Sequence, residues 1–239
     1  MSRALHRVLV TRTEPGATRQ AEALREAGLA AVKLPLLEIE PVPCRAPREV
    51  PEIAIVLSAH AVTHGAEFIA AWGNEPAWLA VGKATARVLA QAGIAAEHPR
   101  RESSEGLMAL KALADCQGRR VAILCGEHPR ALLHESLTAR KAHVTEYPVY
   151  RRLSLVRNSD YHAHFAHLSA VVVSSIEGLQ VFAELWNRHS DAQSILLCVN
   201  SDRAAARARE LGFDDVRTAR APSGAGLAQE IRGWLRVRS

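Results

Sequence analysis

Six places along the chain share a pattern that suits the binding of an anion. At each one a short apolar run ends in a small or hydroxylated residue, and a helix-like segment follows directly. The free backbone N–H groups and the dipole at such a helix start both favour negative charge. The six residues are Thr11, Ser58, Gly82, Gly126, Ser174 and Ser201. Any one of them is also an ordinary helix cap, but six together favour a site for carboxylates or phosphates.

Standard motifs narrow the chemistry further. Neither a G-x-G-x-x-G nor a G-x-x-x-x-G-K-[ST] loop occurs, so a nucleotide ligand is not favoured. A G-x-S-x-G elbow and an H-E-x-x-H pair are also missing from the sequence. The four cysteines have no C-x-x-C spacing, and reduced thiols are expected rather than disulfides or a metal site. These are Cys44, Cys116, Cys125 and Cys198.

Composition sets limits on the class of protein. The 239 residues are 48% hydrophobic and 23% charged, as expected for a globular protein. No apolar run approaches the roughly 20 residues that cross a bilayer, and the first residues lack a signal-like stretch, so we expect a cytoplasmic protein. The net charge of +5 suits an anionic ligand or no special partner. Aromatic residues make up 5% and do not alternate with basic clusters, which argues against nucleic acid.

Short apolar strands alternate with helical segments along the whole chain, which predicts α/β layers around parallel sheets. In open parallel sheets, ligands bind outside the carboxyl ends of the strands, where the six residues fall. We expect Thr13 to cap the first helix and residues 61–72 to be helical. The predicted strands cover residues 8–10, 53–57, 78–81, 121–124, 170–173 and 195–199.

The chain also contains an internal duplication. Equivalent residues of the two copies are separated by similar distances along the chain. Pro35 and Pro148 are 113 residues apart, Ser58 and Ser174 are 116 apart, and Ser103 and Ser223 are 120 apart. The separation increases slowly along the chain, as expected if one unit was duplicated and the second copy later gained residues in its loops. A repeat this long indicates two homologous halves rather than a solenoid.

Several segments, in this order and spacing, resemble the uroporphyrinogen-III synthase family over nearly the whole chain. Departures from the family pattern include Thr13 in place of a proline, His60 in place of an asparagine, and Cys125 before Gly126. The matching segments are Val8-Leu9-Val10-Thr11-Arg12, Leu34-Pro35-Leu36, Ser58-Ala59-His60-Ala61-Val62, Val81-Gly82-Lys83-Ala84-Thr85-Ala86, Val149-Tyr150 and Val173-Ser174-Ser175.

The resemblance implies a fold of two flavodoxin-like, three-layer α/β domains with parallel sheets, joined by a two-stranded linker. The first domain is discontinuous and combines residues 1–36 with residues 153–239. The second domain covers residues 40–147. The linker strands cover residues 37–39 and 148–152, which places the two proline-containing stretches at equivalent positions of the repeat.

The resemblance also implies a reaction. A member of this family closes linear hydroxymethylbilane, a polycarboxylate, to uroporphyrinogen III with inversion of ring D and loss of water. It is a cyclising hydro-lyase of tetrapyrrole and heme biosynthesis that needs neither a metal nor an organic cofactor. The family further suggests a monomer, with possible transient hand-over of substrate from hydroxymethylbilane synthase.

Site residues follow from the matched positions. Tyr150 is the expected catalytic residue, because a phenol keeps its proton at neutral pH and can donate it to the leaving hydroxyl. The alternative for Tyr150 is an aromatic packed at the domain junction. Arg12 could pair with a substrate carboxylate bidentately. The remaining expected substrate contacts are Thr11, Ser58, Gly82, Lys83, Thr85, Ser174, Ser175 and Ser201.

Two other functions remain open at this point. One is a tetrapyrrole- or anion-binding regulatory protein of the same fold without catalysis. The other is a sugar- or phosphate-binding hinge protein, against which the lack of an export signal counts. Formation of uroporphyrinogen III from hydroxymethylbilane separates the enzyme from both alternatives.

Overall fold

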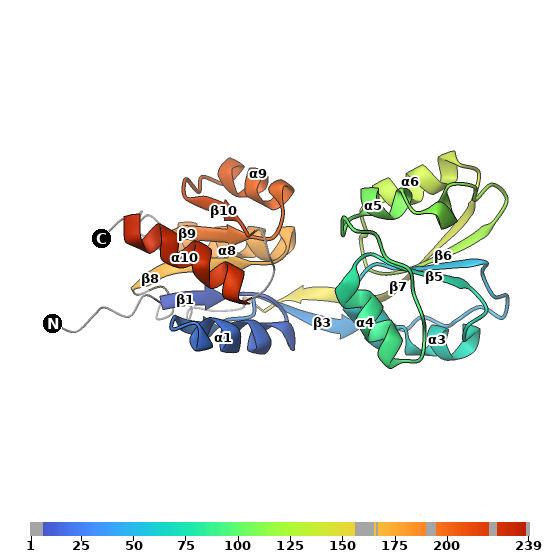
Figure 1. Ribbon diagram of the computed structural model, residues 1–239, viewed down its shortest axis with the longest axis horizontal. Coiled ribbons are helices and arrows are strands. Elements are labelled where there is room, and N and C mark those ends of the chain that lie inside the picture. The colour runs from blue at the N-terminus through green and yellow to red at the C-terminus, as the bar shows by residue number, and fades with distance from the viewer. Residues whose placement is uncertain (1–6, 156–164, 166, 190–194, 220–223, 238–239) are drawn as a thin grey trace. The chain divides into compact units, whose positions relative to one another are not determined.

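The computed structural model describes residues 7–155, 165, 167–189, 195–219 and 224–237. The chain divides into two compact units, one formed by Met1–Glu38 with Leu153–Ser239 and the other by Ile39–Arg152. Each unit contains a five-stranded sheet with helices packed against it (Figure 1). Two strands, β3 (Leu37–Pro41) and β7 (His143–Ser154), carry the chain from one unit to the other.

The sheet of the first unit has the strand order of a doubly wound fold. Its strands are β1 (Arg7–Val10), β2 (Ala30–Lys33), β8 (Leu168–Val173), β9 (Leu196–Val199) and β10 (Val216–Thr218). They lie side by side as β10-β9-β8-β1-β2, with parallel pairing throughout. Read in chain order this is the flavodoxin order 2-1-3-4-5.

Alternate residues of these strands build two cores. Val8, Val10 and Val172 face α1 (Gly16–Glu26) and α10 (Gly224–Val237). Leu9 and Val171 face the opposite way, toward α8 (Ile176–His189) and α9 (Asp202–Glu210). Because successive side chains of a strand point to opposite faces, an all-apolar strand needs helices on both sides. The first unit is therefore a three-layer α/β structure.

The second unit repeats this plan. Its sheet has the order β3-β7-β6-β4-β5, in which β4 (Ile53–Val56), β5 (Ala77–Ala80), β6 (Arg120–Gly126) and β7 are parallel. One face packs on α2 (Ala59–His64), α3 (Ala66–Trp72) and α4 (Lys83–Gln91). The other packs on α5 (Ser104–Met108), the short 3-10 helix η1 (Lys111–Leu113) and α6 (Ala131–Ala139). The predicted α/β class with parallel sheets is confirmed.

The expected cap of the first helix was wrong. Pro15 occupies the cap position before α1 and makes no side-chain hydrogen bond to the helix. Instead, the Glu14 carboxylate accepts a hydrogen bond of 3.0 Å from the backbone N–H of Thr18. Because proline can stand at a helix start without a donor of its own, the helix begins after Pro15 and leaves Thr13 outside.

The helical segment expected over residues 61–72 is present, but it divides into α2 and α3 at Gly65. A Cβ at Gly65 would lie 2.5 Å from the carbonyl oxygen of Ala61. The backbone is therefore too tight at this point for a side chain, and glycine lets two short helices meet there.

Candidate functional site

Three predicted residues of the second unit lie at the carboxyl ends of neighbouring strands. Ser58 follows β4, Gly82 follows β5, and Tyr150 in β7 pairs with Gly126 at the end of β6. Strands β4 and β6 are neighbours although β5 separates them in the sequence, so the strand order reverses between them. Ligands of doubly wound sheets bind at such a reversal.

The phenol of Tyr150 lies in a small polar cluster at the carboxyl ends of β4 and β6. The residue is only 2% exposed. Its oxygen accepts hydrogen bonds from Ser58 Oγ at 3.0 Å and from Arg152 Nη2 at 2.9 Å. The rings of His60 and His64 lie 5.7 and 6.1 Å from the Tyr150 ring, centroid to centroid. The structure thus brings Tyr150 and Ser58 together.

Arg152 was not among the predicted site residues. Besides its hydrogen bond to the phenol oxygen, its Cζ lies 5.3 Å from the centroid of the Tyr150 ring, within the range of a cation–π contact. A signal for it existed in the sequence, because residues two apart on a strand share a face. Tyr150 and Arg152 have that spacing within β7.

Ser58 has a second role as the cap of α2. Its Oγ accepts a hydrogen bond of 3.0 Å from the backbone N–H of Ala61. An N-terminal cap of this kind stabilises a helix by about 1 kcal/mol. The capping bond fixes the Ser58 side chain next to the phenol of Tyr150.

The start of α4 already holds a carboxylate of the chain itself. The backbone N–H of Lys83 donates to Glu102 Oε1 at 3.2 Å. A Cβ at Gly82 would lie 2.7 Å from Glu102 Cδ, so only glycine leaves room for this carboxylate. Thr85 is buried in the first turn of α4, whereas the Lys83 side chain is exposed. Glu102 was not among the predicted site residues, because 19 residues separate it from Lys83 in the sequence.

The first unit gathers its own set of predicted residues at the carboxyl ends of β1, β8 and β9. Ser175 Oγ accepts from the N–H of Gly178 at 3.1 Å, and Ser201 Oγ accepts from the N–H of Ala204 at 3.3 Å. Both serines therefore cap helices, which leaves each hydroxyl hydrogen to donate outward. The carbonyl of Ser174 accepts a bond of 2.9 Å from Asn200 Nδ2.

Thr11 has a structural partner. It is 3% exposed, and its Oγ1 donates to the carbonyl oxygen of Val172 at 2.9 Å, as its backbone N–H does at 3.2 Å. The hydroxyl hydrogen is thus used to join the end of β1 to β8, and its oxygen lone pairs are what it could offer a ligand.

Arg12 is placed where an anion would be stabilised. Its guanidinium lies against Gly16 at the start of α1, so that a Cβ on Gly16 would lie 2.8 Å from Arg12 Cζ. Arg12 is exposed on one side, but its partial desolvation lowers its pKa from the ordinary value, and the nearby charge of Arg19 lowers it further. A carboxylate beside Arg12 would offset both effects and would also suit the helix start.

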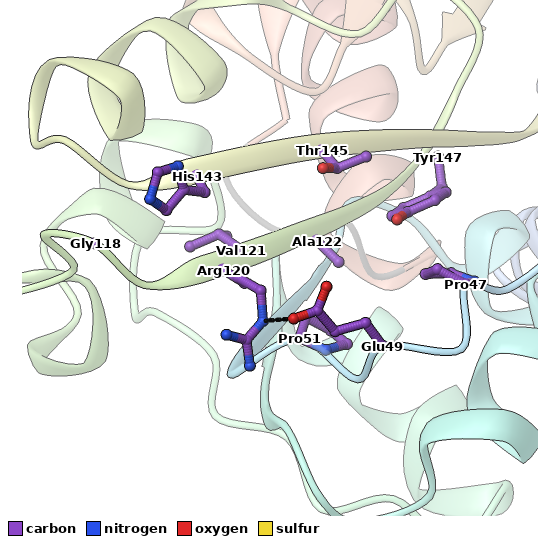
Figure 2. Close-up of a pocket in the computed structure, with 10 residues that line it drawn as sticks. All are labelled: Pro47, Glu49, Pro51, Gly118, Arg120, Val121, Ala122, His143, Thr145 and Tyr147. Carbon is purple, nitrogen blue, oxygen red and sulfur yellow. Dashed lines mark ion pairs between the residues drawn. The ribbon is translucent and has the colours of Figure 1, made fainter.

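A pocket of about 410 Å³ lies elsewhere in the second unit. Figure 2 shows it between the first residues of β6 and β7 and the loop that contains Pro47 and Pro51. The Arg120 guanidinium pairs there with the Glu49 carboxylate, Nε to Oε1, at 3.2 Å. None of the predicted site residues lines this pocket, which opens at the amino-terminal rather than the carboxyl ends of these strands.

Within the described ranges, no group of three or more His, Cys, Asp or Glu side chains could hold a metal ion. In the same part of the chain, no helix is long and apolar enough to cross a membrane.

The fold and these strand ends define the class as a two-unit α/β protein, each sheet having an edge suited to anions. A family model described as "Uroporphyrinogen-III synthase HemD" matches residues 18–229. The chain is 32% identical to the uroporphyrinogen-III synthase of Escherichia coli (strain K12) over 236 residues, covering 89% of this chain and 94% of that protein. The enzyme of the same name from Salmonella typhimurium is 33% identical with the same coverage. The chain belongs to the uroporphyrinogen-III synthase family.

Solved structures agree on the fold. A mutant uroporphyrinogen III synthase from the extremely thermophilic bacterium Thermus thermophilus aligns with a TM-score of 0.65 at 17% identity, covering 97% of this chain and 99% of that one. The uroporphyrinogen-III synthetase of Helicobacter pylori 26695 aligns with a TM-score of 0.64 at 14% identity, covering 97% and 100%. At such identities the likeness supports the two-domain α/β fold alone.

Proposed function

We propose that this chain is a uroporphyrinogen-III synthase, which closes hydroxymethylbilane to uroporphyrinogen III with inversion of ring D and loss of water. The observation that carries this proposal is the match to relatives of that name over 89% of the chain. A match of this extent includes both units, so the chain has the whole framework of the enzyme and not one half of it.

Recognition of the substrate needs groups that bind carboxylates. In the first unit these are Arg12 and the hydroxyls of Ser175 and Ser201, with Thr11 and Ser174 beside them. In the second unit they are the first turn of α4, with Gly82, Lys83 and Thr85, together with Ser58. The carboxylate of Glu102 on the N–H of Lys83 supports this reading, because it is an example of a carboxylate held at a predicted contact.

The chemical step needs a proton for the leaving hydroxyl, and Tyr150 is the donor in this proposal. Its oxygen accepts bonds from Ser58 and Arg152, which occupy its lone pairs and leave its own proton for the substrate. When the phenol proton passes to the hydroxyl of the substrate, the bond between carbon and the hydroxyl oxygen breaks and water departs. The proton released when the new ring system regains aromaticity restores the phenol. Burial of Tyr150 limits competition from bulk water.

Several finer features belong to the same proposal and rest on the family resemblance. The reaction proceeds without a metal or an organic cofactor, because proton transfer and positioning suffice for the loss of water and ring closure. The enzyme works as a monomer in the cytoplasm and receives hydroxymethylbilane from hydroxymethylbilane synthase. The two domains are joined by linker residues 37–39 and 148–152.

The test supplies freshly prepared hydroxymethylbilane to the purified protein and measures the isomers of the oxidised product. Spontaneous closure gives uroporphyrinogen I, so the expected result is isomer III well above the protein-free background. Heat-denatured protein is the matched control. If isomer III stays at the background level while the native protein still binds a uroporphyrin, the non-catalytic regulatory protein becomes the better description.

A further inference from the structure

The guanidinium groups of Arg151 and Arg152 contact different partners. Arg151 forms an ion pair with the Glu40 carboxylate and is 47% exposed in its side chain, as is usual for a surface arginine. Arg152 lies one residue on and therefore on the other face of β7, which is the face of Tyr150. Its Nη2 donates to the phenol oxygen at 2.9 Å.

The same guanidinium contacts the phenol twice, at its oxygen and at its ring. Its Cζ lies 5.3 Å from the ring centroid, close enough for the cation–π attraction. Two contacts from one planar group restrict rotation of the ring, and Ser58 Oγ fixes the oxygen from another direction at 3.0 Å. The orientation of the phenol is therefore determined by Arg152 together with Ser58.

We infer that Arg152 is a positioning residue that holds Tyr150 for proton donation and stabilises the negative charge that forms on its oxygen. This inference rests on the proposed function, in which the phenol proton goes to the leaving hydroxyl and the electron pair stays on the phenol oxygen. Arg152 gives up no proton in this step. The attraction between the guanidinium and the phenol oxygen grows when that oxygen becomes negative, because two opposite charges then face each other. The contact thus strengthens in the transition state and raises the rate rather than the affinity.

The first arm of the test measures the single-turnover rate and the steady-state KM for formation of isomer III by Arg152→Gln, Arg152→Lys and the matched control Arg151→Gln. We expect Arg152→Gln to lower the rate about 10- to 100-fold with KM nearly unchanged, within the range of general-acid effects. Arg152→Lys should recover part of the loss, because it keeps the charge but not the planar fork. Arg151→Gln should match the wild type. A raised KM with an unchanged rate would overturn the inference, because it would make Arg152 a ligand of a substrate carboxylate.

The second arm separates action through Tyr150 from an independent effect. In a Tyr150→Phe background, Arg152→Gln should cause no further loss of rate, because the oxygen on which it acts is gone. If the two losses multiply, Arg152 does not act through Tyr150 and the inference fails.

A third arm does not depend on activity. The shifts in urea midpoint for Arg152→Gln and Tyr150→Phe should be non-additive in the double variant, because the residues are in contact. If the wild type forms no isomer III, the proposed function fails, and this arm still decides whether Arg152 holds Tyr150. Additive midpoint shifts would overturn the positioning role even in an active enzyme.

Discussion

The backbone of Gly126 lies directly against the ring of Tyr150. The two residues are paired across β6 and β7, at a point where the register shifts between Cys125 and Gly126. A Cβ at position 126 would lie 2.7 Å from Cζ, 2.8 Å from Cε2 and 3.0 Å from the phenol oxygen of Tyr150. The missing side chain of Gly126 therefore creates the space that the phenol occupies beside Ser58 and Arg152.

Gly126→Ala should displace the Tyr150 ring and destabilise the second unit by about 1–3 kcal/mol, as overpacking of a filled site does. The midpoint of urea unfolding measures this. Gly233→Ala in α10 is the control, since nothing lies within 4 Å of its added Cβ, and it should be neutral or stabilising. Equal midpoints for Gly126→Ala and the wild type would mean that the ring is not confined as described.

Tyr150→Phe should lower the rate of isomer III formation by about 100-fold, because it removes the proton that the phenol donates. The aromatic packing remains, so the far-UV circular dichroism spectrum should not change. The amount of uroporphyrinogen I formed by spontaneous closure should not change either. Tyr147→Phe is the matched control on the same strand, since the Tyr147 ring packs on Phe68 and Trp72. A Tyr150→Phe variant with the wild-type rate would assign Tyr150 a purely structural role.

Glu102→Gln should make the start of α4 more available to a substrate carboxylate. The Glu102 carboxylate now accepts the N–H of Lys83, and a neutral amide competes less well for that donor. An effect of about 1 kcal/mol at a helix start corresponds to a decrease in KM of roughly fivefold. Steady-state measurement of KM with hydroxymethylbilane checks this, with Glu49→Gln, at the pocket of Figure 2, as the control. A KM that rises instead would show that Glu102 assists binding.

The free energy of unfolding should decrease in acid as the carboxylate of Glu105 becomes protonated. Its pKa is lowered from 4.5 to about 2, chiefly by a hydrogen bond from its own backbone N–H, then by Ser103 and Arg130. A carboxyl with a lowered folded-state pKa contributes stability above its unfolded pKa and loses it as the pH falls through the folded one. The loss therefore runs from about pH 4.5 down to about pH 2. Glu105→Gln should flatten this part of a curve of urea midpoint against pH, and an unchanged slope would contradict the assignment.

Two buried thiols should resist alkylation. Burial raises the pKa of Cys125 to about 12 and that of Cys198 to about 12, so neither forms the reactive thiolate at pH 8. Iodoacetamide at that pH should leave both unmodified in the native protein and label both in urea, as read by mass spectrometry of peptides. Labelling of Cys125 in the native state would indicate opening of the sheet edge near Tyr150.

The structure follows the sequence pattern where both partners of an interaction are neighbours in the chain. Ser58 and Ser201 cap their helices by bonds to residues three positions on, so a short stretch of sequence contains both partners. The apolar strands and the hydroxylated strand ends could be recognised in the same way. The expected cap at Thr13 was wrong, because Pro15 occupies the position before α1. The helical segment over residues 61–72 was found, although Gly65 divides it into α2 and α3.

By itself, the sequence determined the α/β class, the duplication and the strand ends at which a carboxylate ligand is expected. Only the tertiary structure decided which of these ends meet. Ser58 and Tyr150 are 92 residues apart. They touch because only β6 lies between β4 and β7, and Gly126 of β6 has no side chain where the phenol lies. The contact of Gly126 with the ring depends on the same strand order. The contact of Arg152 with the phenol instead lies within β7, where the partners are two positions apart. A single sequence records no distances between strands, because their order arises from packing of the whole unit rather than from neighbouring residues.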